Sequence, residues 1–181
     1  MNTLFIDTHY LDIIIAYLEN GSIVDKKEVI NKKNNSEFIF PTIIDVLNDK
    51  KIDEVIVVNG PGSFTGVRLG VTIAKTFAYS LKIGLKTIDS LKVVAISTNN
   101  KKIALGDENG YYIGYFNNNY DQIKDYIYLS NDEFNNLDDK DEYTKEYILD
   151  IERVYGYLKN KDTINCHEAK PIYVKKIGVE L

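Results

Sequence analysis

Residues 59–68 have the sequence NGPGSFTGVR, and this glycine-rich stretch lies between two patterns of regular structure. Before it, residues 54–58 form a β-branched run without polar alternation, which is typical of a strand covered on both faces. After it, apolar residues at helical spacing predict a helix over 65–81, and a further strand is expected over 84–88. A strand, a helix and a second strand in this order indicate parallel pairing within an α/β fold.

The residues upstream predict an antiparallel opening to the same sheet. Apolar runs at 4–8 and 11–18 precede a third β-rich run at 22–30. Asn20-Gly21, between the second and third runs, is a strong signal for a two-residue hairpin turn. Ser36 is expected to cap a helix that ends at Leu47, with Pro41 bending the early part of this helix or delaying its start. The predicted order is β-β-β-α-β-α-β, a mixed sheet that combines antiparallel and parallel pairing.

Two interpretations of the glycine-rich stretch follow from its residues. The glycines lack the spacing of the dinucleotide-binding fingerprint, and no Gly-Lys-Ser/Thr of a P-loop is present. A structural turn explains the composition, because proline fixes one φ angle, glycines permit tight turns, and a hydroxyl can bond the first free N–H groups of the helix. The alternative is an anion or nucleotide site at the helix N-terminus, where free N–H groups and the helix dipole favour negative charge. The residues concerned are Gly60, Pro61, Gly62, Ser63, Thr65 and Gly66.

The second half of the chain repeats the opening in faint form. Residues 104–107 echo 4–7, because in both segments an apolar run ends in Asp and a hairpin is predicted to follow. Residues 113–118 echo 15–20, since both end in an Asn-containing turn, although short strands of this kind also arise by chance. The echo indicates two related lobes. We expect an N-terminal lobe over 1–98, a small second lobe over 99–165, and a C-terminal tail over 166–181 that returns towards the lobes.

Composition limits the chemistry and the partners of this chain. Among 181 residues there are one Cys, two His and two Arg, so side chains that usually carry catalysis or bind metals are scarce. A single cysteine cannot form an internal disulfide, which fits a reducing cytoplasm. The 27 acidic and 22 basic residues give a net charge of −5, which argues against a surface that coats nucleic acid. Apolar runs are shorter than the ~20 residues of a membrane helix, so we expect a cytoplasmic protein without membrane contact.

Three segments carry a resemblance to one protein family. They are GPGSFTGVR at 60–68, IDT at 6–8 and KPIYV at 170–174. In these segments the chain resembles the TsaB/YeaZ family of bacterial tRNA threonylcarbamoyladenosine synthesis, with the match dense over 1–90. The resemblance implies a two-lobed actin-like ATPase (ribonuclease H-like) fold, here with a truncated second lobe. It also implies a non-catalytic scaffold that binds and activates the enzyme TsaD and recruits the ATPase TsaE.

The same resemblance identifies positions that match a nucleotide site. In this superfamily the Asp-Thr turn of the first hairpin lies near the nucleotide phosphates, so Asp7 and Thr8 match it, and Asp107 is the candidate in the second lobe. His9 and Tyr10 are bulkier than the usual residues and would crowd a phosphate. We therefore expect a vestigial loop, with no catalytic residue, metal or cofactor on the isolated chain and with ATP and a metal on partner subunits. The alternative is a small actin-like nucleotide-dependent kinase or hydrolase that uses Asp7 and the glycine turn.

The helix predicted over 65–81 is apolar on two faces. Both faces can be core, or one can pack on the sheet while the other, with the helix over 36–47, meets a partner. The resemblance favours a helical contact with TsaD in a heterodimer, or with a second copy in a homodimer when TsaD is absent. Direct tRNA binding by this chain is not expected, given its charge. The candidate interface residues are Ile43, Leu47, Arg68, Leu69, Gly70, Ile73, Ala74 and Phe77.

Overall fold

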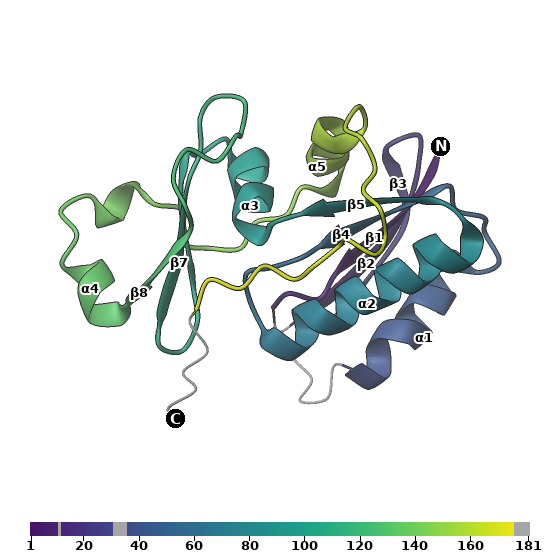
Figure 1. The fold of residues 1–181 in the computed structure, drawn as a ribbon, viewed down its shortest axis with the longest axis horizontal. Coiled ribbons are helices and arrows are strands. Elements are labelled where there is room, and N and C mark those ends of the chain that lie inside the picture. Colours follow the sequence, from purple (N-terminus) through teal and green to yellow (C-terminus); the bar gives the residue numbers. More distant parts are fainter. Residues whose placement is uncertain (11, 31–35, 176–181) are drawn as a thin grey trace. The chain divides into compact units, whose positions relative to one another are not determined.

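The structure, a computed structural model, describes residues 1–10, 12–30 and 36–175 of the chain (Figure 1). It divides the chain into two units. The first contains residues 1–90 and 151–171, and of the described residues the second contains 91–150 and 172–175. The first lobe was predicted as the continuous segment 1–98. The first unit instead combines 1–90 with a later segment, 151–171.

The first unit follows the predicted order β-β-β-α-β-α-β and adds a helix from late in the chain. Its elements are β1 (Asn2–Asp7), β2 (Ile13–Glu19), β3 (Ser22–Val29), α1 (Ser36–Leu47), β4 (Glu54–Val58), α2 (Phe64–Leu81), β5 (Gly84–Ile88) and α5 (Ile151–Leu158). The strands form one sheet in the order β3-β2-β1-β4-β5. Strand β1 pairs antiparallel with β2 and parallel with β4, so the predicted mixed sheet is confirmed.

The hairpin between β2 and β3 turns at the predicted residues. Asn20 and Gly21 have φ angles of 51° and 93°, both in the left-handed region. Positive φ at both central residues is the requirement of the two-residue hairpin turn whose twist matches that of the strands, which explains the preference for Asn-Gly. The prediction of a hairpin at this position is confirmed.

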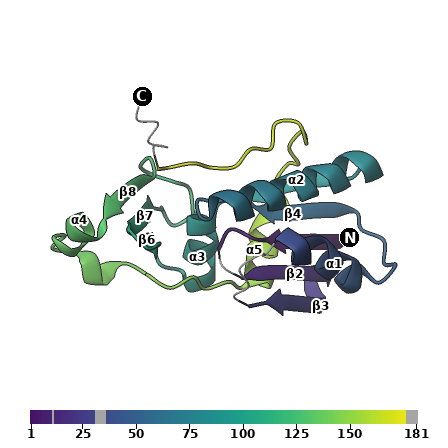
Figure 2. The same cartoon turned by 90° about the horizontal axis from the view of Figure 1, so that it is seen from below.

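Both faces of the sheet are covered. Leu4 belongs to a core formed with α1 and α2, which lie side by side in Figures 1 and 2. The neighbouring Thr3 points to the other face, since side chains alternate along a strand. There its hydroxyl donates to the buried Glu54 carboxylate at 2.9 Å, and Glu54 pairs with Lys86 at 3.0 Å. Lys86 Nζ also donates to the Lys159 carbonyl at 3.3 Å, just after α5, so α5 belongs to this second face.

The second unit is built on a smaller antiparallel sheet. Its elements are α3 (Ser90–Thr98), β6 (Lys102–Gly106), β7 (Gly110–Tyr115), β8 (Ile127–Ser130), α4 (Asn131–Asn135) and a short 3₁₀ helix (Lys140–Glu142), and α3 begins at the last residue of the first unit. Strands β6 and β7 form the predicted hairpin, with Asp107 directly after β6. The core is aromatic: the Phe134 ring stacks on Tyr111 at 4.2 Å between centroids and meets Tyr143 edge-on at 5.6 Å.

No helix formed by the described residues is long and apolar enough to cross a membrane.

Candidate functional site

The glycine turn joins the end of β4 to the start of α2. Gly60 has a φ of 93°, a conformation that glycine adopts without strain, and the Gly60–Pro61 peptide bond is cis. Ser63 is the N-cap of α2, because its hydroxyl accepts a hydrogen bond from the Gly66 N–H at 3.3 Å. The Ser90 hydroxyl donates to the Pro61 carbonyl at 2.7 Å. These are the contacts of the structural turn, one of the two interpretations of this stretch, and Ser63 rather than Thr65 is the cap.

Three glycines let α2 and its preceding turn lie directly on the residues that follow β1. A Cβ added at Gly62 would overlap the His9 carbonyl oxygen, and one added at Gly66 would overlap the Thr8 carbonyl oxygen. At Gly70 the overlap would be with the Thr8 hydroxyl, which itself donates to the Gly66 carbonyl at 2.7 Å. We call this close approach of Gly62, Gly66 and Gly70 to residues 8–9 the glycine seat. Within it the motif glycines serve packing of backbone on backbone.

A carboxylate and an imidazole are paired inside the turn after β1. Asp7 and His9 are only 1% and 2% exposed, and His9 Nδ1 lies 2.6 Å from Asp7 Oδ1. The His9 N–H donates to the same oxygen at 3.1 Å, while the His9 carbonyl accepts from the Ser63 N–H at 2.6 Å. Such a pair orients an imidazole for acid–base chemistry when substrate can reach it. Here both groups are buried, and the Asp7 carboxylate is engaged by the bulky His9 within its own turn.

Asp107 has a different environment, at the β6–β7 turn of the second unit. Its Oδ1 accepts from the Asn109 and Gly110 N–H groups at 2.9 and 3.1 Å and from the Tyr128 hydroxyl at 2.6 Å. Its Oδ2 accepts from Lys175 Nζ at 2.6 Å. Burial alone would raise the pKa of Asp107, but the hydrogen bonds from Lys175 and Tyr128 hold that pKa below its ordinary value. This carboxylate therefore holds a turn and the C-terminal segment of its unit.

The predicted interface residues divide into buried and accessible positions. Half of them belong to the core of the first unit and are unavailable to a partner: Ile43, Leu47, Gly70 and Ala74. For these four the prediction is corrected, because Ile43, Leu47 and Ala74 pack in the core beneath the helices and Gly70 lies against Thr8. Arg68 is exposed, with its guanidinium 3.6 Å from the centre of the Phe64 ring. Leu69, Ile73 and Phe77 are half-buried and pack against the same core.

Sequence reasoning missed two residues of the accessible surface. Phe40 and Ile44 on α1 are 54% and 51% exposed, and the Phe40 ring lies 6.4 Å from that of Phe77 on α2. Their spacing of four residues places them on one side of α1, but Ile43 is only three residues from Phe40, so the spacing alone does not separate the two exposed residues from the buried one. With Leu69, Ile73 and Phe77 they form what we call the α1/α2 apolar surface.

Metal ligands do not gather in the described part of the chain. No group of three or more His, Cys, Asp or Glu side chains lies close enough there to hold an ion. His9 is used in the Asp7 pair, and the other histidine, His167, follows Cys166 beside α2.

Comparison with known proteins gives a family match and several relatives. The family model for TsaD, tRNA N6-adenosine threonylcarbamoyltransferase, matches residues 30–114. The chain is 38% identical over 100 residues to the tRNA threonylcarbamoyladenosine biosynthesis protein TsaB of Bacillus subtilis, an alignment that covers 52% of this chain and 44% of TsaB. It is 26% identical over 191 residues to the uncharacterized protein MG208 of Mycoplasma genitalium, covering 95% and 94% of the two chains. The match to B. subtilis TsaB therefore spans less than half of that protein's length.

A solved structure supports the fold. YeaZ from Pseudomonas aeruginosa matches with a TM-score of 0.73 at 14% sequence identity, over 95% of this chain and 99% of that one. A likeness at this identity concerns the fold, and it confirms the predicted actin-like class.

Proposed function

Because the chain belongs to the TsaB/YeaZ family, we propose that it is a non-catalytic subunit in the biosynthesis of threonylcarbamoyladenosine in tRNA. In this role it binds and activates a TsaD enzyme and recruits the ATPase TsaE. TsaD supplies the catalytic metal and the nucleotide site, and the threonylcarbamoyl group is transferred to a tRNA adenosine. The present chain contributes the surface on which the complex assembles.

The observation that carries this proposal is the α1/α2 apolar surface. Phe40 and Ile44 are both more than half exposed to solvent, and the Phe77 ring lies beside that of Phe40. Clustered apolar side chains on two adjacent helices mark a protein interface in a water-soluble fold, because burying them against a partner releases the water they order.

The two candidate nucleotide-loop carboxylates support a role without catalysis by this chain. Asp7 is buried against His9, and Asp107 is bonded to Tyr128, Lys175 and its own turn. A metal-bound phosphate at either carboxylate would have to displace these contacts. The glycine seat, in turn, sets the position of α2 and so the position of half of the proposed interface.

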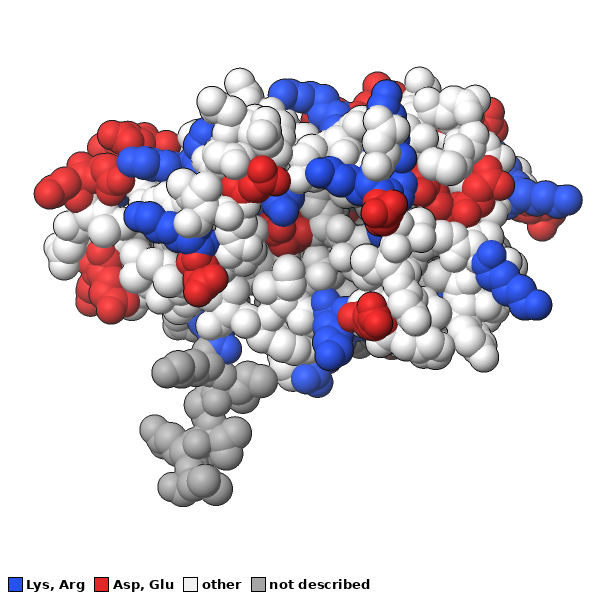
Figure 3. All heavy atoms as spheres, turned by 45° about the horizontal axis from the view of Figure 1, so that its top comes forward, with Lys and Arg blue, Asp and Glu red and all other residues white. Residues whose placement is uncertain are grey.

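The net charge of the chain and its distribution favour tRNA binding by other subunits. The net charge is −5, and in Figure 3 the basic and acidic side chains of the described residues are interspersed over the visible face, which no continuous basic area crosses. Phosphate backbones require clustered Lys and Arg for tight binding at physiological salt. We therefore expect the tRNA to contact TsaD.

Co-purification with TsaD from the same organism tests the proposal. The wild-type chain is expected to form a stable heterodimer, and Ile44→Lys is expected to weaken it at least tenfold, because a lysine would be desolvated at the interface. Val24→Lys is the matched control, since Val24 on β3 is also 51% exposed but lies off the α1/α2 apolar surface. A wild-type chain that does not bind TsaD, or equal weakening by both lysines, would contradict the proposal.

Two further outcomes of such experiments have distinct meanings. Self-association of the isolated chain that Ile44→Lys abolishes would indicate that a second copy covers the same surface when TsaD is absent. Calorimetry with ATP and Mg²⁺ tests the alternative, a small nucleotide-dependent kinase or hydrolase. Tight binding with turnover by the chain alone would favour that alternative and count against a non-catalytic subunit.

A further inference from the structure

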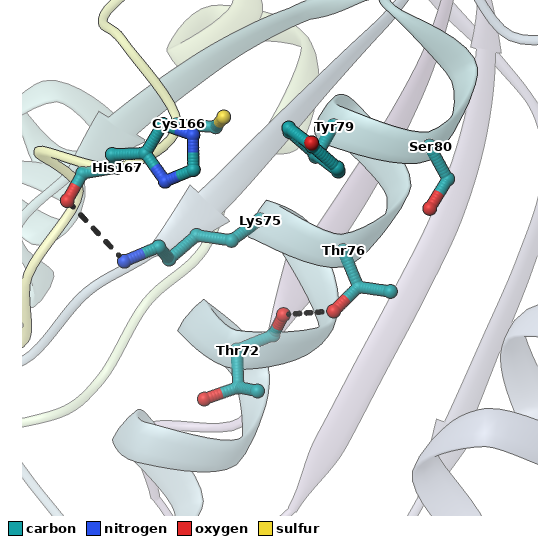
Figure 4. A pocket seen from close by; sticks show the side chains of 7 residues that line it. All are labelled: Thr72, Lys75, Thr76, Tyr79, Ser80, Cys166 and His167. Atoms are coloured by element: carbon teal, nitrogen blue, oxygen red, sulfur yellow. Dashed lines mark hydrogen bonds between the residues drawn. The ribbon is translucent and has the colours of Figure 1, made fainter.

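A cleft in the first unit lies between α2 and the segment that follows α5. Its volume is about 320 Å³, within the size range of pockets for small molecules (Figure 4). Lys75 lies about 200° around the helix from Phe77 at 100° per residue, so the cleft is on the other side of α2 from the α1/α2 apolar surface. The lining residues are Thr72, Lys75, Thr76, Tyr79, Ser80, Cys166 and His167.

Lys75 brings a positive charge to this cleft that its protein contacts do not neutralise. The side chain is half-buried, and its Nζ donates to the Ala169 carbonyl at 3.2 Å and to the His167 carbonyl at 3.5 Å. Figure 4 shows the side chain reaching from α2 towards His167. Among the residues that the structure describes, Lys75 forms no ion pair with a carboxylate. An ammonium has three protons to donate, so one remains after both carbonyls are satisfied.

The other polar groups of the lining can also donate hydrogen bonds. The His167 ring meets the Tyr79 ring edge-on, at 5.5 Å between centroids, and an imidazole and a phenol each carry a proton that can be donated. The Thr76 hydroxyl is satisfied by the Thr72 carbonyl at 2.9 Å, whereas the Thr72 hydroxyl stays exposed at the edge of the cleft. No carboxylate is among the lining residues. The cleft is therefore complementary to a negatively charged acceptor.

We propose that this cleft binds a small oxyanion, carried by a phosphate or a carboxylate group, with Lys75 as its charged contact and His167 and Thr72 as further hydrogen-bond donors. Hydrogen bonds between an ammonium and an oxyanion are roughly twice as strong as those between neutral groups, and partial burial of Lys75 reduces screening by water. The cleft is larger than an oxyanion, so the molecule that carries the group has room beside the Tyr79 ring. The proposal does not depend on TsaD.

Titration of the full, ¹⁵N-labelled chain tests this site, with inorganic phosphate and acetate as separate probes and sodium chloride at matched ionic strength as the reference. We expect saturable shifts of the Thr72, Lys75 and His167 amide signals with at least one probe. Binding of phosphate alone would assign a phosphate ligand, and binding of acetate alone a carboxylate ligand. Lys75→Met is expected to weaken binding at least tenfold, whereas Lys51→Met, at an exposed lysine of the same unit, leaves it unchanged.

A second variant separates ligand binding from folding. Lys75 also holds residues 167–169 against α2 through its hydrogen bonds to the His167 and Ala169 carbonyls. Replacing Lys75 therefore changes both the binding of the ligand and the packing of this segment. Thr72→Val removes only a donor at the edge of the cleft, and we expect it to weaken binding severalfold with an unchanged amide spectrum elsewhere. Failure of both probes to shift these amides relative to sodium chloride, or affinity that survives both Lys75→Met and Thr72→Val, would overturn the proposal.

Discussion

Replacing Gly66 with alanine perturbs the glycine seat at its tightest point. The added Cβ would lie well under 3.0 Å from the Thr8 carbonyl oxygen, a distance that real Cβ atoms do not show. The obstructing atom is backbone in the turn after β1, so it cannot rotate away as a flexible side chain could. Either α2 or that turn must shift, and the 2.7 Å hydrogen bond from the Thr8 hydroxyl to the Gly66 carbonyl is strained by the shift.

The magnitude follows from three contributions. Overpacking of a close-packed site costs about 1–3 kcal/mol. Loss of the Thr8 hydrogen bond adds about 1 kcal/mol. The higher helix propensity of alanine opposes these by up to ~1 kcal/mol, since Gly66 lies in the first turns of α2. The free energy of unfolding of the first unit is therefore expected to fall by roughly 1–4 kcal/mol.

Urea denaturation followed by circular dichroism measures this loss. With a slope of about 1–3 kcal/mol per molar urea, the midpoint should fall by about 1 M. Gly156→Ala in α5 is the matched control, because a Cβ there meets nothing within 4 Å and should stabilise the helix by up to ~1 kcal/mol. Hydrogen exchange of peptides from β1 and α2 assigns the change to the first unit. A Gly66→Ala midpoint equal to or above that of the wild type would refute the packing role of this glycine.

Three more outcomes are expected elsewhere in the chain. The pKa of Asp107 is lower in the folded state than in the unfolded state. The Asp107 carboxylate therefore stabilises the fold fully above the unfolded pKa of ~3.9, and this stabilisation is lost as pH falls through the lower folded pKa. The difference in urea midpoint between the wild type and Asp107→Asn should accordingly disappear below about pH 4. Glu54→Leu leaves the buried Lys86 ammonium without its partner and should cost about 3–5 kcal/mol, whereas the double variant with Lys86→Met should recover most of the thermal midpoint. Phe134→Ala empties the aromatic core and should remove about 3–5 kcal/mol from the second unit, measured by near-ultraviolet circular dichroism, with exchange in α2 unchanged.

Local signals predicted the elements of the first unit closely. Asn20-Gly21 indicated the hairpin because few residue pairs adopt two positive φ angles, and these two do. The β-branched run at 55–58, after Glu54, indicated a strand covered on both faces, and all five residues of β4 are buried. The helix expected to end at Leu47 does so in α1, but α1 already includes Ser36, which was expected to be its cap, and Pro41 does not delay its start.

Helices α3 and α5 had no comparable signal and were not predicted. The apolar positions of α5, Ile151, Val154, Tyr155 and Leu158, are spaced as in a helix, but the segment has only eight residues. Its attachment to the first unit also depends on contacts with residues more than seventy positions away, such as the Lys159 carbonyl with Lys86. Such contacts leave no local pattern in either segment.

The candidate site shows the same division. The resemblance of the segments at 6–8, 60–68 and 170–174 was enough to suggest the family and the fold class that it implies. Glycine spacing and capping hydroxyls, which are properties of the chain itself, favoured a structural turn at 60–66. Which apolar residues remain exposed was not contained in that pattern: Ile43 is buried and the adjacent Ile44 is 51% exposed. The difference depends on which side of α1 the sheet covers. Hydrophobic periodicity indicates that a helix has an apolar face, but it does not indicate what packs against that face. Likewise, the burial of Asp7 against His9 and the donor-lined cleft at Lys75 exist only because distant segments fold onto the same strand and helix.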